Sequence, residues 1–90
     1  MAQLEQFKLS AEIVKGLKTQ PTNDELLLLY GLYKQGTIGN CQSPEPSMLF
    51  YKEKSKWAAW MKQKGKDKNI SQSEYCNLVL KLVEKYGLVN

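Results

Sequence analysis

Residues 21–39 read PTNDELLLLYGLYKQGTIG and carry the clearest helix signals in the chain. Thr22 and Glu25 fit a capping box, T-x-x-E, which marks a helix start. Gly39 supplies the stop, just after Ile38. The apolar residues between them cover most of the helix circumference: Leu26, Leu27, Leu28, Leu29, Tyr30, Leu32 and Tyr33. A helix of this kind must be covered on more than one face, so we expect one side to meet the core and a second to meet another helix or a ligand.

Periodic apolar residues predict a helix on either side of this segment. Residues 3–18 place apolar side chains at spacings of three and four, at Leu4, Phe7, Ala11, Val14 and Leu17. Residues 51–64 carry a stripe of Trp57, Trp60 and Met61 and stop at Gly65. Each stripe occupies one face, which is typical of an amphipathic helix.

A second capping box, Ser71 with Glu74, predicts the start of the last helix. Gly87 stands where a helix is expected to end, after a stripe of Cys76, Val79, Leu80, Val83 and Tyr86. Residues 40–50 contain two prolines and form a long connection. We find no alternating strand pattern, so the expected fold class is all-α, with four helices and one long crossover.

Length and composition limit the classes of protein that the chain can represent. Ninety residues make a single domain, which we place at residues 1–90, with a modest core and any ligand in a groove. The N-terminal residues lack the continuous apolar run of a signal peptide, and the longest such run, Leu26–Tyr30, is far below the roughly 20 residues of a membrane span. Cys41 and Cys76 lack metal-ligand spacing. We therefore expect a cytoplasmic protein with free thiols and no membrane insertion.

The sequence contains neither histidine nor arginine. This excludes Ser-His, Cys-His and His-metal chemistry within the chain, and no Gly-rich phosphate loop is present. We expect no catalytic residues, no metal and no cofactor. Residues 52–68 hold seven lysines against Glu53 and Asp67, a local charge of +5, while the rest of the chain sums to −1. An anionic partner is favoured by this asymmetry, and the alternative is a solvated lysine face without a ligand.

Several of these groups suit one amphipathic anion. On a helical wheel, Leu27, Tyr30 and Lys34 fall within a sector of about 60°, and Tyr33 lies at its edge. A ring can stack on a flat base, an ammonium can pair with phosphate, and an apolar side chain can cover a hydrocarbon tail. A sixteen-carbon tail would contribute on the order of 10 kcal/mol before ordering costs.

The other helices add to the same set. Lys52 and Lys56 are four residues apart and share a helix face, and Tyr75 stands in the first turn of the last helix. Tyrosines and lysines at helical spacing are also common in cores and on solvated faces. Two alternatives stay open: a small nucleic-acid-binding domain, which the pI of about 9.1 favours and the lack of arginine opposes, and a module that docks a partner protein on the apolar second helix.

Two long motifs resemble the acyl-CoA-binding protein family. The stretch 21–39 resembles the family signature around Tyr-x-x-Tyr-Lys-Gln, here Tyr30, Tyr33, Lys34 and Gln35. The stretch 46–60, PSMLFYKEKSKWAAW, resembles the family pattern Pro-Gly-Met-Leu followed by Lys-Trp-x-Ala-Trp. LKTQP at 17–21 and KYGL at 85–88 also fit, so the match spans nearly the whole chain.

The resemblance implies a four-helix bundle of up-down-down-up topology, for which the long connection is needed because parallel neighbouring helices require a crossover. It implies a monomer that binds medium- to long-chain fatty acyl-CoA with high affinity, one molecule per protein. Such a protein acts as an intracellular acyl-CoA carrier and pool former, without enzymatic activity, nucleic-acid partner or stable membrane insertion.

The resemblance also assigns ligand positions. Tyr30 corresponds to the tyrosine near the adenine, Lys34 and Lys56 to lysines near the coenzyme A phosphates, and Lys52 to a contact one turn earlier. The remaining ligand positions are Lys15 on the first helix, Leu27 along the acyl groove, Tyr33 of the signature, and Tyr75, which closes the site. The chain departs from the family pattern at Gly36, Ser47, Phe50, Tyr51 and Glu53, and we expect Gly36 to loosen the end of the second helix.

Overall fold

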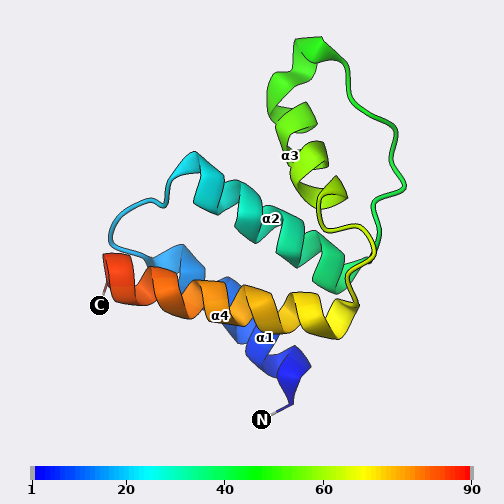
Figure 1. The fold of residues 1–90 in the computed structure, drawn as a ribbon. Coiled ribbons are helices and arrows are strands. Elements are labelled where there is room, and N and C mark those ends of the chain that lie inside the picture. The colour runs from blue at the N-terminus through cyan, green and yellow to red at the C-terminus, as the bar shows by residue number, and fades with distance from the viewer. Residues whose placement is uncertain (1, 90) are drawn as a thin grey trace.

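The structure is a computed structural model that describes residues 2–89, and these fold into helices joined by loops (Figure 1). The chain order is α1 (Gln3–Ile13), the 3-10 turn η1 (Val14–Gly16), α2 (Asn23–Thr37), the 3-10 turn η2 (Met48–Phe50), α3 (Tyr51–Met61) and α4 (Lys68–Tyr86). The all-α prediction is confirmed. Within the described residues, every helix is too short or too polar to cross a bilayer.

Helices α2 and α4 run antiparallel and are tied together at both ends. At the start of α2, the Glu25 carboxylate accepts hydrogen bonds from Tyr86 Oη (2.6 Å) and Lys85 Nζ (2.9 Å). At the end of α2, the Gly36 carbonyl accepts from Gln72 Nε2 at 2.9 Å, in the first turns of α4. The two helices therefore lie side by side along most of α2 (Figure 1).

Helix α1 runs parallel to α4. Its first residue, Gln3, donates through Nε2 to the Asn69 carbonyl at 2.8 Å. After η1, the backbone N–H of Lys18 donates to the Gly87 carbonyl at 2.9 Å, beyond the end of α4. The two helices thus begin together and finish together.

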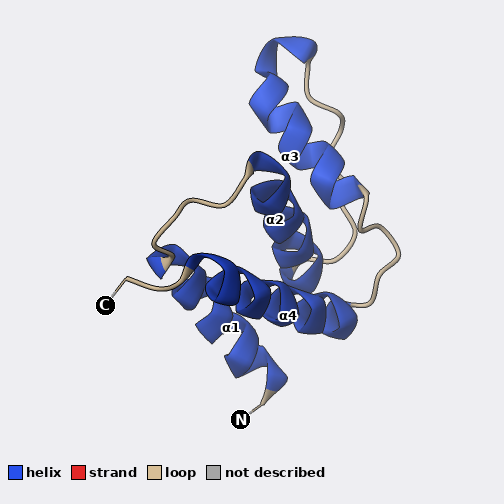
Figure 2. Cartoon of the chain, turned by 60° about the vertical axis from the view of Figure 1, so that its left-hand side comes forward, coloured by secondary structure: helices blue, strands red, loops and turns tan. Residues whose placement is uncertain are grey.

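Helix α3 lies along the other side of α2 and points in the same direction. The Lys56 ammonium stands 5.8 Å from the Tyr30 ring centre, and the Lys34 ammonium stands 4.9 Å from the Trp60 ring centre, so both helices advance together. Residues 38–47 carry the chain back between them (Figures 1 and 2). The up-down-down-up topology is therefore confirmed.

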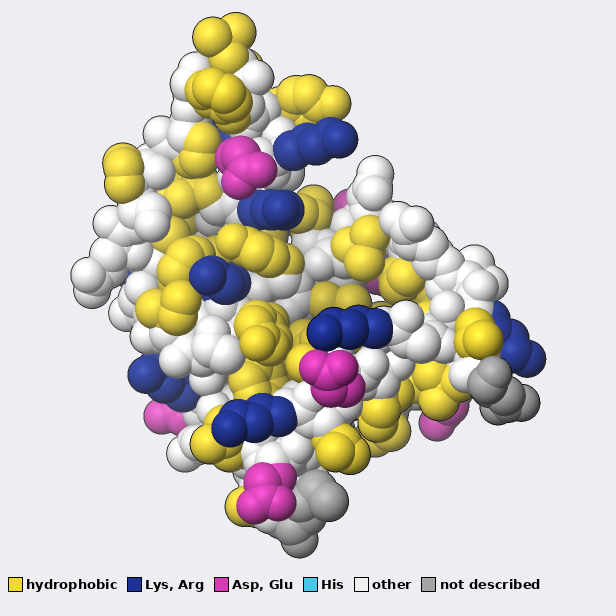
Figure 3. All heavy atoms as spheres, turned by 180° about the vertical axis from the view of Figure 1, so that it is seen from behind, with side chains coloured by type: hydrophobic (Ala, Val, Ile, Leu, Met, Phe, Trp, Pro, Cys, Tyr) yellow, Lys and Arg dark blue, Asp and Glu magenta, His cyan; other side chains and the backbone are white. Residues whose placement is uncertain are grey.

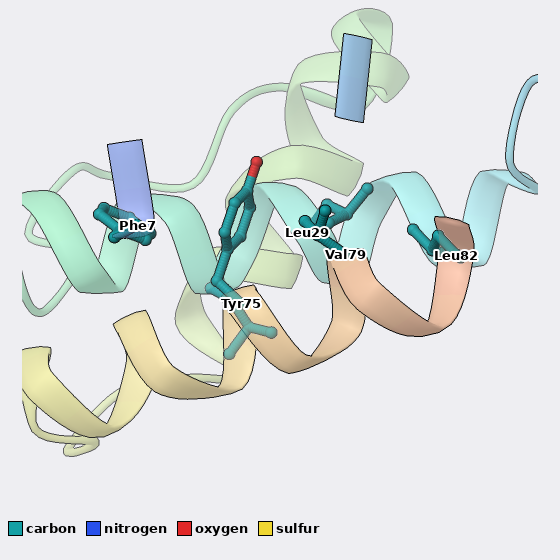
Figure 4. Packing of buried hydrophobic residues seen from close by; sticks show 6 residues of the cluster. Phe7, Leu29, Tyr75, Val79 and Leu82 are labelled. Carbon is teal, nitrogen blue, oxygen red and sulfur yellow. The ribbon is translucent and has the colours of Figure 1, made fainter. Parts of the chain in front are cut away.

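The core lies between α1, α2 and α4. It is formed by Phe7, Leu29, Leu32, Tyr75, Val79 and Leu82, each less than a tenth exposed. Figure 4 shows Leu29, Val79 and Leu82 meeting in the space between α2 and α4. Helix α3 stands outside this cluster, which leaves its contact with α2 to other groups.

The crossover loop is pinned by side chains of α2 and α3. The indole N–H of Trp57 donates to the Ser43 carbonyl at 2.8 Å, and that of Trp60 donates to the Gly39 carbonyl at 2.7 Å. The buried amide of Gln35 donates at 2.9 Å to Asn40 Oδ1 and at the same distance to the Lys66 carbonyl. These bonds fix where α3 begins and ends relative to α2.

Three expected element boundaries were wrong. Helix α4 begins at Lys68 with Asp67 as its N-cap, whose carboxylate accepts from the Asn69 N–H at 2.7 Å, and not at Ser71, which is fully buried inside the helix. Aspartate caps a helix as well as serine does, so the capping box was one of two admissible starts. The first helix ends at Ile13, where a tighter 3-10 turn follows. The third ends at Met61, three residues early.

Two glycines of α2 permit close helix packing. A Cβ on Gly31 would stand 2.5 Å from the Ala59 carbonyl oxygen of α3. A Cβ on Gly36 would stand 3.1 Å from the Phe7 ring and 3.2 Å from Gln72 Cγ. Contrary to expectation, Gly36 does not end α2 early, because the helix continues to Thr37 and the missing side chain lets α1 and α4 approach.

Substituting Gly31 by alanine should force α2 and α3 apart, because the added methyl group meets backbone that cannot rotate away. Overpacking of this kind costs about 1–3 kcal/mol. Gly16→Ala is the matched control, since its Cβ would meet only Leu88 Cδ2, at 4.0 Å. We expect Gly31→Ala to be less stable than Gly16→Ala by about 1–3 kcal/mol in urea unfolding. Equal stability of the two variants would contradict the close approach.

The Glu25 cluster predicts a pH dependence of stability. The hydrogen bond from Tyr86, then those from Lys85 and the Thr22 backbone, lower the pKa of Glu25 from 4.5 to about 2. A carboxylate with a lowered pKa stabilises the fold fully above its unfolded-state pKa and loses this contribution as the pH falls through the folded-state value. Stability should therefore decline between about pH 5 and pH 2.

Glu25→Gln tests this. The variant should be less stable than the wild type at neutral pH, and the gap should close as the pH falls from about 5 to about 2. Urea unfolding followed by circular dichroism at each pH measures the gap. Glu84→Gln removes an exposed carboxylate of α4 and serves as the control for charge alone. A gap for Glu25→Gln that stays constant with pH would show that the ionised carboxylate contributes nothing.

Candidate ligand-binding groove

Helix α2 leaves one strip uncovered between its two neighbours. Leu29 and Leu32 face the core, while Gly31 and Lys34 face α3. Between these two sides, Leu26 is 36% exposed, Tyr33 is 40% exposed and Tyr30 is partly buried. In the view from behind, hydrophobic side chains gather over the middle of the molecule with lysines beside them (Figure 3). The strip is therefore an apolar surface with a basic margin.

A groove runs between the first halves of α2 and α3, with a volume of about 410 Å³. From α2 it is lined by Leu26 and Leu27, and from α3 by Lys52 and Lys56. Its other lining residues are Asn23, Tyr51 and Ser55. One wall is thus apolar and the other carries two ammonium groups, so the groove can take a ligand with a hydrocarbon part and an anionic part.

Two lysines at this groove are held over aromatic rings. Lys56 stands over Tyr30 and Lys34 over Trp60, at 5.8 and 4.9 Å from the ring centres. Such cation–π contacts are worth about 0.5–2 kcal/mol. By contrast, the salt bridges of the described residues pair other lysines with carboxylates: Lys15 with Glu12, Lys54 with Glu45, Lys66 with Glu74, and Lys85 with Glu25. The charges of Lys34 and Lys56 are therefore positioned without being neutralised by these carboxylates.

Three aromatic rings meet beside the strip. Phe7 of α1 stacks on Tyr33 with ring centres 5.4 Å apart and meets Tyr75 edge-on at 5.1 Å. Tyr33 and Tyr75 are 5.7 Å apart. In Figure 4 the Tyr75 ring rises from α4 past α2, with its hydroxyl at the far end. The ring of Tyr75 is thus a core element whose polar tip points away from α4.

Burial keeps two tyrosines protonated. It raises the pKa of Tyr75 to about 12, with smaller contributions from Tyr33 and Cys76. Burial, followed by the charge of Glu53 and by Cys41, also raises the pKa of Tyr30. Both hydroxyls are therefore neutral hydrogen-bond donors at physiological pH.

Comparison with known proteins identifies the family. The family model described as acyl CoA binding protein matches residues 4–79. The chain belongs to the acyl-CoA-binding protein family. Related proteins include a putative acyl-CoA-binding protein from a tardigrade of the genus Hypsibius, 55% identical over 93% of this chain and 94% of the relative, and acyl-CoA-binding protein homolog 1 of Caenorhabditis elegans, 49% identical over 90% and 94%.

Solved structures of the family share the fold. The crystal structure of acyl-CoA-binding protein 2 from Oryza sativa superimposes with a TM-score of 0.90 at 37% identity, covering 93% of both chains. That of the acyl-CoA-binding protein from Moniliophthora perniciosa gives 0.85 at 30% identity, covering 94% of this chain and 83% of the other. The family resemblance drawn from the sequence motifs is confirmed.

The structure brings most of the expected ligand residues together in two groups. Leu27, Lys52 and Lys56 line the groove. Tyr30 and Lys34 lie beside it through their contacts with Lys56 and Trp60. The second group consists of Tyr33 and Tyr75, which meet over Phe7.

Lys15 lies apart from both groups. It stands in η1, and its ammonium pairs with Glu12 at 3.3 Å, one turn earlier in the same part of the chain. Both side chains of this pair are mostly exposed. A surface ion pair of this kind contributes little and can be exchanged for another anion. In addition, residues 2–89 contain no group of three or more carboxylate or thiol side chains that could hold a metal ion.

Sequence reasoning missed several residues that line the groove. Leu26 precedes Leu27 and lies beside Tyr30 on the helical wheel, so the exposed sector could have been widened to include it. Tyr51 and Ser55 repeat the four-residue spacing of Lys52 and Lys56 one position earlier, and this signal was available. Trp60 was assigned to an apolar stripe, and its role under Lys34 required the packing of two helices.

Proposed function

We propose that this chain binds medium- to long-chain fatty acyl-CoA esters, one molecule per protein, in the groove between α2 and α3 and on the strip beside it. The relatives that carry the name acyl-CoA-binding protein support the ligand class. Residues 1–90 act as one binding domain. The protein carries and stores acyl-CoA without catalysing a reaction.

The observation that carries this proposal is the placement of Lys34 and Lys56 over aromatic rings at the edge of an apolar groove. An arriving phosphate does not have to displace a carboxylate from either lysine. The rings also hold the two side chains near their working positions, which reduces the ordering cost of binding. Charge-assisted contacts to phosphate are about twice as strong as neutral hydrogen bonds.

The groove supports the other half of the ligand. Leu26 and Leu27 offer an apolar wall to the acyl chain, where each buried CH₂ contributes about 0.8 kcal/mol. The tail therefore supplies most of the affinity, and the charged and aromatic groups select the headgroup. Withdrawal of the tail from water is also the basis of the carrier role, because it keeps a poorly soluble ester in solution.

We assign roles within the headgroup site as follows. Tyr30 stacks on the adenine, Lys34 and Lys56 bind the phosphates, and Lys52 adds a contact one turn earlier on α3. Tyr33 and Tyr75 close the site with their aromatic edges. Lys15 is mobile enough, as an exposed side chain, to leave Glu12 for an anion. That the protein works as a monomer in the cytoplasm stays a prediction of the sequence.

Isothermal titration with palmitoyl-CoA tests the proposal, with free coenzyme A and free palmitate as controls. We expect one-to-one binding of the ester and much weaker binding of either half, because the groove and the lysines each recognise one part. Ester binding no stronger than that of free palmitate would remove the headgroup site from the proposal. Absence of ester binding would overturn the function.

Lysine variants test the headgroup assignment. Removal of a charge-assisted contact costs about 1.5–3 kcal/mol, so Lys34→Ala and Lys56→Ala should each weaken palmitoyl-CoA binding about ten- to a hundredfold. The matched control is Lys64→Ala, an exposed lysine in the turn after α3. All three should keep the helical circular dichroism of the wild type. If Lys34→Ala or Lys56→Ala binds as tightly as Lys64→Ala, that lysine has no role in the site.

A further inference from the structure

The end of the molecule at the start of α3 exposes four consecutive apolar or aromatic side chains. Met48, Leu49, Phe50 and Tyr51 are 75%, 86%, 62% and 68% exposed, and we call residues 48–51 the α3 tip. The tip projects away from α1, α2 and α4 at the top of Figure 1, and hydrophobic side chains cover the same end in Figure 3. Contiguous exposed apolar surface of this kind marks an interaction site.

The α3 tip is an ordered turn. The Ser47 side chain caps it by accepting from the Leu49 N–H at 3.2 Å, and the Ser47 carbonyl accepts from the Phe50 N–H at 2.9 Å. Lys54 Nζ also contacts Met48 Sδ at 2.9 Å. The backbone thus holds the apolar side chains outward from a fixed turn.

Basic residues follow directly behind the tip. Helix α3 carries Lys52, Lys54 and Lys56 against Glu53. Lys54 is paired with Glu45 at 2.9 Å, whereas Lys52 is exposed and Lys56 faces the Tyr30 ring. An apolar knob with a collar of net positive charge complements a surface that is apolar inside and anionic outside.

We propose that the α3 tip inserts into the surface of an anionic lipid bilayer. Leu49 and Phe50 enter the boundary of the acyl chains, Tyr51 lies at headgroup level, where tyrosine is favoured, and Lys52 pairs with lipid phosphate. A convex tip of four residues suits a deformable lipid surface, because a specific protein interface needs far more area, about 800 Å² per partner.

The tip adjoins the candidate groove. Tyr51 and Lys52 belong to the tip region and also line the groove. A docked molecule would therefore open its acyl site at the lipid surface, where a long-chain ester can enter or leave without crossing water. This consequence rests on the proposed function, whereas docking itself does not.

Co-sedimentation with vesicles tests the proposal. The wild type should be retained on vesicles of phosphatidylcholine with phosphatidylserine and much less on phosphatidylcholine alone. The double substitution Leu49→Ser and Phe50→Ser should weaken retention at least about tenfold, since two large apolar side chains no longer enter the lipid. The matched control is Leu80→Ser, which changes a leucine of α4 that is 61% exposed, and it should behave as the wild type.

The opposite outcomes overturn docking. They are no retention of the wild type, equal retention on neutral vesicles, or retention of the double variant at the wild-type level. Gel filtration that shows a dimer only for the wild type would assign the tip to a second copy of the chain.

Titration with palmitoyl-CoA separates the two proposals. If the double variant loses ester affinity and keeps vesicle retention, the tip covers the acyl tail and docking is wrong. If the wild type binds vesicles and not the ester, the proposed function fails while docking stands.

Discussion

Helix α2 carries more apolar surface than one neighbour can cover. Leu29 and Leu32 are buried against α1 and α4, and the Gly31 side meets α3 at a distance that leaves no room for a Cβ. These two contacts occupy opposite parts of the helix surface. The strip with Leu26 and Tyr30 remains between them, so the candidate site is the part of α2 that the fold does not cover. Any change in how α3 packs on α2 therefore changes the site as well.

The parallel pairing of α2 and α3 is what makes the crossover loop necessary, and the loop in turn is held by the site helices. Trp60 serves both purposes, because its indole N–H binds the Gly39 carbonyl while its ring lies under Lys34. Gln35, one residue beyond Lys34, binds Asn40 and the Lys66 carbonyl. Stability of the loop and position of a headgroup lysine are thus coupled through adjacent residues of α2 and one tryptophan of α3.

The sequence was sufficient where the signals are local. The capping box of Thr22 and Glu25 is present as expected, and Gly39 adopts a φ of 100°, so α2 was predicted to within about one residue. The start of α4 was not, because both Asp67 and Ser71 are admissible caps and the choice depends on where α1 packs.

The same limit applies to the candidate site. The helical wheel placed Leu27, Tyr30 and Lys34 on one strip without knowledge of the neighbours, and the structure brings them to the groove. It could not show that Lys34 would rest on a tryptophan, nor that Lys15 would pair with Glu12, because both depend on where another side chain lies in space. What separates a lysine that is free to bind an anion from one already neutralised is therefore a tertiary property. In this chain it distinguishes side chains that composition alone treats as equal.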